Sequence, residues 1–383
     1  MKKKICCVIT ARPSYARVKS ALIAIKNNKN LELQIILTSS ALLDKYGSIV
    51  EVLKEDGLVP TKTIYNALEG ESLLTSVKTT ALGMMELASA FESLCPDAVI
   101  TIADRYETMA SAVTAAYMNI PLIHIQGGEV TGSIDEKVRH AVTKLSDLHL
   151  VSNKDAYDRV SSLGEHIDKI FITGCPSIDL ALEIKSLAEP ASSELFEIGV
   201  GVKIEPEKPY IVVMQHPVTY EYEKAESNIL HTLKAIEKFN IQTIWFWPNI
   251  DAGSDQVSKA LRMHREFNDG SPIRFMKNLP PERFLTLINN SECLIGNSSV
   301  GIRESSILGL PVVNIGSRQN RRLRASNVID VNYDELQIYD AICSQANHGK
   351  YPSSDIYGNG DSGKKIADII ESVSLTTQKV IQY

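Results

Sequence analysis

Residues 124–140, HIQGGEVTGSIDEKVRH, concentrate side chains that could carry acid–base chemistry. Glu129 and Asp135 are carboxyl groups that can take up or release protons. Arg139 can hold an anion, and His140 can do so or act as an acid. This set of residue types within one short segment predicts a ligand site at which protons are transferred.

The same segment also has a structural interpretation. Gly127 and Gly128 are expected to let the backbone approach a ligand closely. Ser133, however, could cap a helix in which Asp135 and Arg139 are neighbours one turn apart. In that case the last two residues would form only a helix ion pair.

Asp104 is a further catalytic candidate because it follows the apolar run 97–102 and lies in the sequence IADRYE. A carboxylate at the end of a buried strand is well placed to act on a bound ligand. The alternative is a capping box, with Asp104 as the helix N-cap and Glu107 three residues later.

Residues 296–304, GNSSVGIRE, predict a phosphate site. Ser298 and Ser299 follow a short predicted strand and precede a predicted helix. Their hydroxyls, the exposed N–H groups and the helix dipole would cradle a phosphate without the lysine of a Walker motif. Glu304, one turn into that helix, would accept ribose hydroxyls. The alternative is an ordinary serine cap with a glutamate nearby.

Five more polar residues follow apolar runs. Arg12 offers a guanidinium that can bind phosphate through two hydrogen bonds, in a place where helix dipole effects disfavour a cation without a ligand. His216 can donate to an anion or act as an acid. Asn249 and Asp251 suit sugar hydroxyls, with a simple Asx turn as the alternative. Arg318 adds positive charge after a later strand.

These candidates need a scaffold that brings strand ends together. Short apolar runs alternate with longer amphipathic stretches, which is typical of parallel βαβ units. The runs that most clearly predict strands near the candidates are 5–10, 97–102, 121–125, 148–151, 170–173, 210–214, 243–246, 293–295 and 311–314. Ligands bind beyond the carboxyl ends of the strands in such sheets. We therefore predict an α/β protein with two Rossmann-like, doubly wound domains and a cleft between them.

A more polar stretch with three prolines, 189–209, follows the first half of the chain. We predict an N-terminal domain at 1–178 that carries the acid–base residues. A C-terminal domain at 179–363 would bind the nucleotide. The last segment, 364–383, begins with a predicted helix that is a candidate to pack back on the first domain.

Composition excludes several classes of protein. The net charge is −6, with 44% hydrophobic and 22% charged residues, which argues against a nucleic-acid-binding protein. The longest apolar runs are shorter than the ~18 residues of a membrane span. The first residues, MKKKICCVIT, have a basic start, but the apolar run that follows is too short for a secretory signal. The six cysteines form no CxxC pair, which indicates free thiols in a reducing cytoplasm. No cluster has the spacing of metal ligands.

The segments GGE-x-x-G-x-x-D-x-x-x-RH and GNSS-x-GIRE, in this order and spacing, resemble the UDP-N-acetylglucosamine 2-epimerase family over nearly the whole chain. The first segment is similar to the hydrolysing branch, which makes a free 2-acetamido-mannose sugar for sialic-acid-like pathways. The EAGLR-type segment of the non-hydrolysing branch is not present. The resemblance implies a GT-B fold, a UDP-sugar substrate, no cofactor and a cytoplasmic homodimer.

The resemblance and the residue types together predict two groups of site residues. The nucleotide side is expected to comprise Arg12, His216, Asn249, Asp251, Ser298, Ser299, Gly301, Glu304 and Arg318. The sugar side is expected to comprise Asp104, Gln126, Glu129, Asp135, Arg139 and His140. The hydrolysing family usually has Glu where this chain has Gln126, and an amide cannot transfer protons in that role. Either another carboxylate takes over the proton transfer, or the enzyme uses a different substrate. One such substrate is the 2,4-diacetamido sugar of legionaminic acid synthesis.

Inversion at C2 of such a sugar explains why these residue types are needed. No carbonyl acidifies the C2 proton, so simple deprotonation is very hard. Expelling UDP from C1 while a base takes the C2 proton gives a glycal, to which water then adds with reprotonation of C2 from the opposite face. This requires donors on the diphosphate and two carboxyl groups in different protonation states.

We therefore expect a hydrolysing UDP-2-acetamido-sugar 2-epimerase that releases UDP and a free 2-acetamido-manno sugar. A non-hydrolysing epimerase would keep the product linked to UDP. A GT-B glycosyltransferase would need an acceptor to release UDP. A nucleotide-sugar sensor would bind without forming product.

Overall fold

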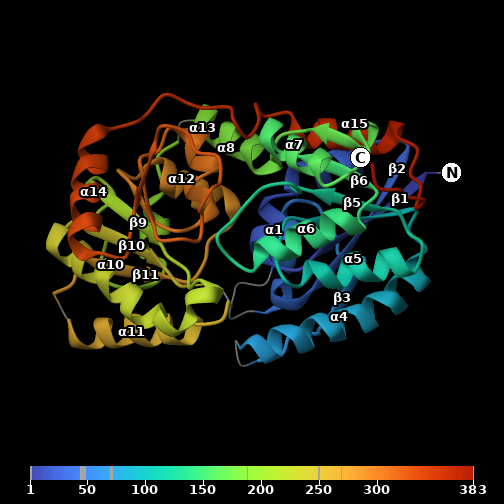
Figure 1. Ribbon diagram of the computed structural model, residues 1–383. Coiled ribbons are helices and arrows are strands. Elements are labelled where there is room, and N and C mark those ends of the chain that lie inside the picture. The colour runs from blue at the N-terminus through green and yellow to red at the C-terminus, as the bar shows by residue number, and fades with distance from the viewer. Residues whose placement is uncertain are drawn as a thin grey trace. The chain divides into compact units, whose positions relative to one another are not determined.

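The computed structural model describes residues 2–43, 49–69, 72–187, 189–248, 251–268 and 270–382. Their contacts divide the chain into two compact α/β units, which are drawn in Figure 1. The first comprises Met1–Glu129, Ile134–Leu180 and Tyr357–Tyr383; the second comprises Val130–Ser133 and Ala181–Ile356. The division predicted from sequence lies at residues 178 and 364, whereas these contacts place it after Leu180 and after Ile356.

The first unit contains a seven-stranded sheet in the order β3-β2-β1-β4-β5-β6-β7. Every neighbouring pair is parallel. The strands are β1 (Lys3–Ile9), β2 (Leu31–Thr38), β3 (Lys62–Ile64), β4 (Ala98–Ile102), β5 (Leu122–Ile125), β6 (Leu148–Val151) and β7 (Ile170–Ile172). The order reverses between β1 and β4, so the carboxyl ends of these two strands form the topological switch point.

Alternation along β1 explains why this sheet has helices on both faces. Ile5, Cys7 and Ile9 belong to one hydrophobic cluster, and Cys6 and Val8 belong to another. A strand buried on both faces reads as a continuous apolar run, as β1 does. The helices of this unit are α1 (Arg12–Ala16), α2 (Lys19–Asn27), α3 (Val50–Glu55), α4 (Leu73–Leu94), α5 (Thr108–Tyr117), α6 (Asp135–Leu145), α7 (Lys154–Ser162), the start of α8 (Pro176–Leu187) and α15 (Ser362–Ser372).

The C-terminal helix α15, red in Figure 1, belongs to the first unit and packs against α2. Lys3 Nζ donates to the carbonyls of Ile370, Glu371 and Val373 at the end of α15, at 2.7–3.2 Å. Cations are favourable at this end of a helix. A Cβ on Gly363 would lie 2.5 Å from the Ser20 backbone, so the two helices meet where glycine permits close approach.

The tail after α15 is anchored by Lys379, whose Nζ donates to three carbonyls at the end of α6 and lies 2.6 Å from Glu165 Oε2. Burial raises the pKa of Glu165, but hydrogen bonds from His149, Lys144 and Lys379 outweigh it and lower that pKa to about 2. The buried carboxylate is therefore held in its charged form.

The second unit contains a seven-stranded sheet in the order β14-β13-β12-β9-β10-β11-β8. Only β8 runs antiparallel to its neighbour. The strands are β8 (Val200–Gly201), β9 (Tyr210–Met214), β10 (Gln242–Phe246), β11 (Ile273–Met276), β12 (Leu294–Gly296), β13 (Val312–Ile315) and β14 (Val328–Val331). The order reverses between β9 and β12. This unit therefore has a switch point of its own.

The helices of the second unit include three that the sequence interpretation did not identify, α9, α11 and α14. They are α9 (Ser193–Glu197), α10 (Ala225–Phe239), α11 (Ser254–Phe267), α12 (Pro281–Asn289), α13 (Glu304–Leu308) and α14 (Glu335–His348). Among the residues described here, no helix is long and apolar enough to cross a membrane. The two parallel-sheet α/β units confirm the predicted fold class.

Candidate active site

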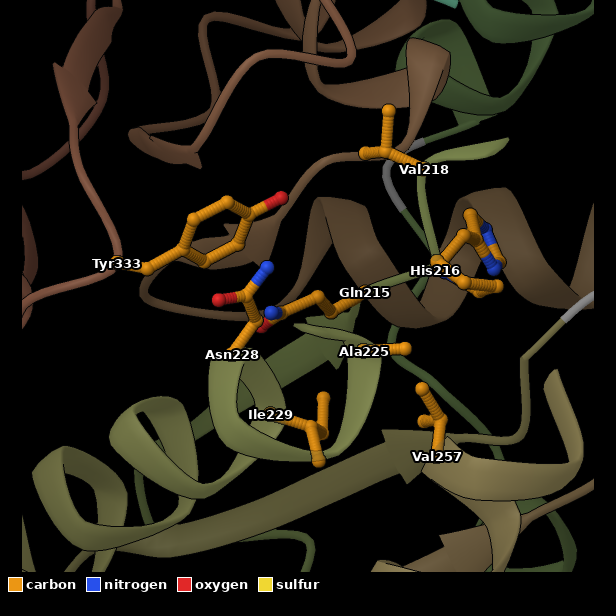
Figure 2. Close-up of a pocket in the computed structure, with 9 residues that line it drawn as sticks. Gln215, His216, Val218, Ala225, Asn228, Ile229, Val257 and Tyr333 are labelled. Carbon is orange, nitrogen blue, oxygen red and sulfur yellow. The ribbon is translucent and has the colours of Figure 1, made fainter. Parts of the chain in front are cut away.

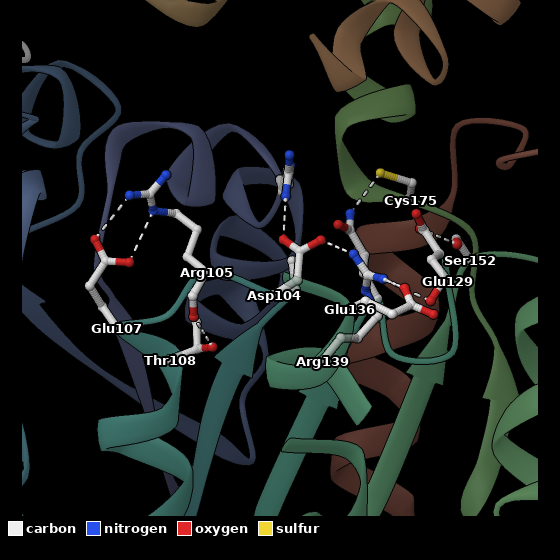
Figure 3. A network of polar contacts seen from close by, with 12 residues as sticks. Asp104, Arg105, Glu107, Thr108, Glu129, Glu136, Arg139, Ser152 and Cys175 are labelled. Atoms are coloured by element: carbon white, nitrogen blue, oxygen red, sulfur yellow. Dashed lines mark hydrogen bonds and ion pairs between the residues drawn. The ribbon is translucent and has the colours of Figure 1, made fainter. Parts of the chain in front are cut away.

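Asp104 and Arg139 form a buried ion pair beyond the carboxyl ends of β4 and β5 (Figure 3). The Arg139 side chain is fully buried, and Asp104 is 5% exposed. Arg17 Nη1 lies 3.6 Å from the other carboxylate oxygen of Asp104. Opposite charges at this distance favour an ionised carboxylate. Asp104 is therefore a charged group fixed at the switch point of the first sheet.

The backbone beside Asp104 is held by His124 of β5. Ala103 has a left-handed φ of 61°, which costs about 1–2 kcal/mol for a residue with a Cβ. His124 Nε2 donates to the Ala103 carbonyl at 2.8 Å, and Thr143 Oγ1 lies 3.2 Å from Nδ1. Burial lowers the pKa of His124 to about 3, so the ring stays neutral and keeps its single N–H on Ala103.

Glu129 lies in the loop after β5 and is 3% exposed. Its Oε1 accepts a hydrogen bond of 2.7 Å from Ser152, which directly follows β6. Arg139 Nη1 donates to the Glu129 carbonyl at 2.8 Å. One guanidinium thus contacts both the Asp104 carboxylate and the Glu129 backbone. Figure 3 shows these contacts as one network.

Gln126 is the first residue after β5 and has a left-handed φ of 66°. Its Nε2 donates to Cys175 Sγ at 2.8 Å, and Cys175 follows β7. Oε1 of the same amide is buried and has no hydrogen-bond partner among the described residues. The residue that departs from the family pattern thus carries an unused acceptor at the strand ends.

The remaining sugar-side candidates lie on α6. Asp135 is its first residue, and Ile134 occupies the N-cap, so Ser133 does not cap this helix as its sequence suggested. Arg139 pairs with Glu136 at 3.2 Å as well as with Asp104. His140 Nε2 lies 2.9 Å from Glu136 Oε1. Arg139 is therefore more than a partner within its own helix.

Another local prediction was wrong. Helix α5 begins at Thr108 with Glu107 at the N-cap, and Glu107 instead pairs with Arg105 at 3.1 Å, so Asp104 heads no capping box. The glycines of the GGE segment approach the protein itself. A Cβ on Gly127 would lie 2.8 Å from His124 Nδ1, and one on Gly128 would lie 2.3 Å from a backbone carbonyl of α7.

His216 and Asn297 join the strand ends at the switch point of the second sheet. Asn297 Oδ1 accepts from the His216 backbone N–H, and Asn297 Nδ2 donates to the His216 carbonyl, both at 2.8 Å. The Asn297 carbonyl in turn accepts from Gln319 Nε2 at 2.9 Å and from Arg318 Nη1 at 3.3 Å. Asn297 is fully buried.

A small pocket borders His216, with an empty volume of about 220 Å³ that includes open solvent. Figure 2 shows His216 and Tyr333 on opposite sides of it, with Gln215 and Asn228 between them. Thr232 Oγ1 donates to Gln215 Oε1 at 2.6 Å, which fixes the Gln215 amide. The pocket wall beside His216 is therefore polar and rigid.

The GNSS segment forms a short 3₁₀ turn, Ser299–Gly301, before α13. Ser298 caps that turn through Val300 N at 3.4 Å. Gly301 packs on β13, because a Cβ there would lie 3.0 Å from the Val312 side chain. Glu304 is the first residue of α13 rather than lying one turn inside a helix. Its Oε2 is buried and has no hydrogen-bond partner in the part of the chain that the structure describes.

The other nucleotide-side candidates are placed as follows. Arg318 Nη2 lies 3.7 Å from Asp251 Oδ2. The segment Val130–Ser133 groups with the second unit, where Gly132 N donates to the Arg318 carbonyl at 3.1 Å. Arg12 is the first residue of α1 in the first unit. Asn249 lies outside the described residues.

Sequence reasoning did not select Arg17, Ser152, Cys175, Asn297 and Gln319. Ser152 and Asn297 directly follow a strand, and Cys175 lies three residues after one. Applying the strand-end criterion to every strand would have found these three. In the described residues no group of histidine, cysteine, aspartate or glutamate could hold a metal ion.

Comparison with known proteins supplies the family. A family described as UDP-N-acetylglucosamine 2-epimerase matches residues 23–371. The chain belongs to this family. A relative from Legionella pneumophila named UDP-N,N'-diacetylbacillosamine 2-epimerase (hydrolyzing) is 31% identical, with 99% of this chain and 98% of the relative covered. A relative from Neisseria meningitidis named UDP-N-acetylglucosamine 2-epimerase is 30% identical, with 98% of each chain covered.

A solved structure supports the fold of this epimerase family member. The UDP-GlcNAc 2-epimerase of Methanocaldococcus jannaschii, in complex with UDP-GlcNAc and UDP, has a TM-score of 0.79 to this chain at 19% identity. The match covers 96% of this chain and 99% of that one. The GT-B fold implied by the sequence resemblance is thereby confirmed.

Proposed function

We propose that this chain is a hydrolysing UDP-2-acetamido-sugar 2-epimerase. The observation that carries the proposal is the match of 99% of the chain to a relative named as a hydrolysing 2-epimerase. The buried Asp104–Arg139 pair supports it, because the reaction needs a fixed acid–base group. Substrates proposed from the relatives' names are UDP-GlcNAc and UDP-N,N'-diacetylbacillosamine.

In this proposal the first unit carries the proton chemistry. A base takes the C2 proton while UDP leaves C1, and a carboxylic acid later returns a proton to C2 from the opposite face. Asp104, which is paired with Arg139, is one carboxyl candidate for these steps. Glu129, which accepts from Ser152, and Asp135 are the remaining carboxyl candidates. Two carboxyl groups in different surroundings can divide the two roles.

The second unit is proposed to hold UDP. Ser298 and Ser299 present hydroxyls after β12, and the unpartnered Oε2 of Glu304 can accept a ribose hydroxyl. His216 and Arg318 supply donors or positive charge for the diphosphate. Such groups stabilise the negative charge that develops on the leaving UDP.

The biological setting is also part of the proposal. A free 2-acetamido-manno sugar, or its 2,4-diacetamido analogue, is a precursor for sialic or legionaminic acid synthesis. We propose that the chain acts there as a cytoplasmic homodimer. The arrangement of the six cysteines, none in a CxxC pair, supports a reducing compartment.

The test is to incubate the protein with each of the two UDP-sugars and to follow UDP and sugar by NMR. We expect free manno-configured sugar and UDP in equal amounts. A UDP-linked epimer with no free sugar would instead show a non-hydrolysing epimerase. UDP release that depends on an added acceptor would show a glycosyltransferase. Binding without turnover of any UDP-2-acetamido sugar would overturn the enzyme assignment.

A further inference from the structure

Cys175 lies in surroundings unlike those of the buried cysteines in the sheets. Cys6 and Cys7 of β1 lie in the apolar core, where burial raises the pKa of both thiols, to about 12 for Cys6. Burial likewise raises the pKa of Cys293. These thiols are inert because burial disfavours a negative charge on sulfur, and at Cys293 a backbone hydrogen bond from Val313 offsets this only in part. Cys175, by contrast, is surrounded by polar groups.

Three features around Cys175 stabilise negative charge on its sulfur. Gln126 Nε2 donates to Sγ at 2.8 Å. The Ser177 hydroxyl lies 3.0 Å from Sγ; either atom can be the donor in the thiol form, and the hydroxyl can donate to a thiolate. Cys175 immediately precedes the twelve-residue helix α8, and its carbonyl accepts from Ile178 N at 2.9 Å as an N-cap residue does. A helix N-terminus and hydrogen-bond donors are the surroundings in which cysteines become reactive.

A second observation shows that the place beside Cys175 is built for a ligand. Oε1 of Gln126 is buried and has no partner in the described part of the chain, although the other end of the same amide holds Sγ. Leaving a buried acceptor unsatisfied costs about 1–3 kcal/mol. Gln126 also keeps a left-handed backbone. A substrate N–H or O–H that bonded to Oε1 would remove this penalty and would lie next to the thiol.

The thiol lies in the same unit as the carboxylates and is drawn close to them. Figure 3 draws Cys175 with Asp104, Arg139, Glu129 and Ser152. Cys175 is fully buried, as is Arg139, and Asp104 and Glu129 are 5% and 3% exposed. Cys175 is therefore about as buried as the proposed catalytic groups, and its burial does not argue against a catalytic role.

We propose that Cys175 is a catalytic residue of this site, that its thiolate takes the C2 proton of the substrate, and that Gln126 is the positioning residue that holds the sulfur and binds a substrate donor. This inference rests on the proposed function. It accounts for the amide at position 126: the amide itself transfers no proton, but its N–H stabilises a thiolate that can.

The step balances as follows. The sulfur lone pair forms the S–H bond, the C2–H electron pair forms the C1=C2 double bond, and the C1–O bond breaks with its electrons leaving on UDP. Water oxygen then bonds to C1. A carboxylic acid on the opposite face protonates C2 and regains its proton from that water. The thiol finally returns its proton to solvent.

The test combines Cys175→Ser, which keeps the size and hydrogen bonds of the side chain, with Cys175→Ala. Both are expected to lower kcat for UDP release by about a hundredfold to ten-thousandfold, with UDP affinity by calorimetry unchanged. Cys343→Ala, on helix α14 of the second unit, is the matched control and should behave as wild type. Turnover of both Cys175 variants within about threefold of wild type would overturn the proposal.

Rescue separates catalysis from packing. Because Gln126 Nε2 lies 2.8 Å from Sγ, a carboxylate at position 126 would place a proton acceptor close to the vacated sulfur position. Gln126→Glu combined with Cys175→Ala should recover at least about tenfold over Cys175→Ala alone. No recovery, together with a lower melting temperature for both single variants, would show a structural role and contradict the proposal.

A readout that needs no turnover keeps the two proposals distinguishable. The ultraviolet absorbance of thiolate, taken as wild type minus Cys175→Ser across pH, reports the ionisation of Cys175. Gln126→Ala should move its appearance to higher pH, and an unchanged profile would contradict the role of Gln126. If wild type turns over no UDP-2-acetamido sugar, the proposed function fails and the C2 step fails with it, whereas normal turnover by the Cys175 variants overturns only this inference.

Discussion

The two sheets have the same kind of switch point but stabilise it with opposite chemistry. In the first unit the ends of β1 and β4 carry charges, with Asp104 paired to Arg139 and Arg17. In the second unit the ends of β9 and β12 are joined by a neutral amide, Asn297, through two hydrogen bonds of 2.8 Å to the His216 backbone.

The difference indicates what each switch point can do. A carboxylate held by two guanidinium groups has a fixed position, which suits proton transfer at a stated atom of a bound substrate. A neutral clamp fixes the backbone, and within the described part of the chain Glu304 Oε2 has no hydrogen-bond partner. Changes in the first unit should therefore alter the rate, and changes in the second should alter folding or nucleotide affinity.

The largest effect is expected from Asp104→Asn. The amide keeps the shape of the side chain but can neither take up nor release a proton, so kcat should fall by about a hundredfold to ten-thousandfold while UDP affinity is kept. UDP release and calorimetry measure the two quantities. Glu107→Gln, which breaks the neighbouring pair with Arg105, is the control for the folding cost of losing a buried ion pair. Near-normal turnover of Asp104→Asn would contradict the expectation that changes at the switch point of the first unit alter the rate.

Asn297→Ala should come second, and its main effect should be on folding. The substitution removes both hydrogen bonds to the buried backbone of His216, which costs about 2–6 kcal/mol at about 1–3 kcal/mol for each group. Urea unfolding measures this loss. Asn314→Ala, which removes one hydrogen bond from the adjacent strand, is the matched control and should cost less. Equal losses would show that the clamp has no special role.

Glu304→Gln should weaken UDP binding by about tenfold to a hundredfold, because hydrogen bonds to charged groups contribute about 1.5–3 kcal/mol. kcat at saturating substrate should change much less. Glu335→Gln is the control, since Glu335 is also the first residue of its helix. If Glu304→Gln lowers kcat and leaves UDP affinity intact, the proposed nucleotide role is wrong.

The strand–helix alternation was enough to predict two α/β domains, because β1, β4 and β9 are short apolar runs. Helix α11 was missed although its sequence carries a helical signal. It buries only Ser254, Val257, Ala260 and Leu261 among fourteen residues, but these residues recur at helical spacing. The left-handed backbone at Ala103, by contrast, is invisible in the sequence, since it depends on a hydrogen bond from His124, twenty-one residues away.

The site was predictable where a titratable group lies just after a strand. Asp104 and His216, each two residues beyond a strand, were found in this way, and their proposed roles remain predictions. Pairings across the sheet were not predictable, because Arg139 meets Asp104 only through the packing of α6 beside β4 and β5. The contact between Gln126 and Cys175 spans three strands of the sheet and needs the strand order as well as the sequence.

The smallest effect concerns acid stability and distinguishes the units without any ligand. The pKa of His124 is about 3 in the folded chain, against an ordinary 6.5, because burial disfavours the charged ring. Between these two pKa values the unfolded chain binds a proton at His124 and the folded chain does not. The contribution of His124 to the free energy of unfolding is therefore full above pH 6.5 and is lost as pH falls toward 3. Between about pH 7 and about pH 5 the loss should be on the order of 2 kcal/mol.

His124→Gln removes this titration and keeps an amide that can donate to Ala103. The free energy of unfolding of the variant should therefore depend less steeply on pH than that of wild type, whatever its value near neutral pH. His348→Gln, at the exposed end of α14, should leave the slope as it is in wild type. Because His124 supports the backbone beside Asp104, the same variant should also lower kcat without weakening UDP binding. A loss of UDP affinity instead would contradict the proposed division of roles, in which the first unit carries out proton transfer and the second unit binds UDP.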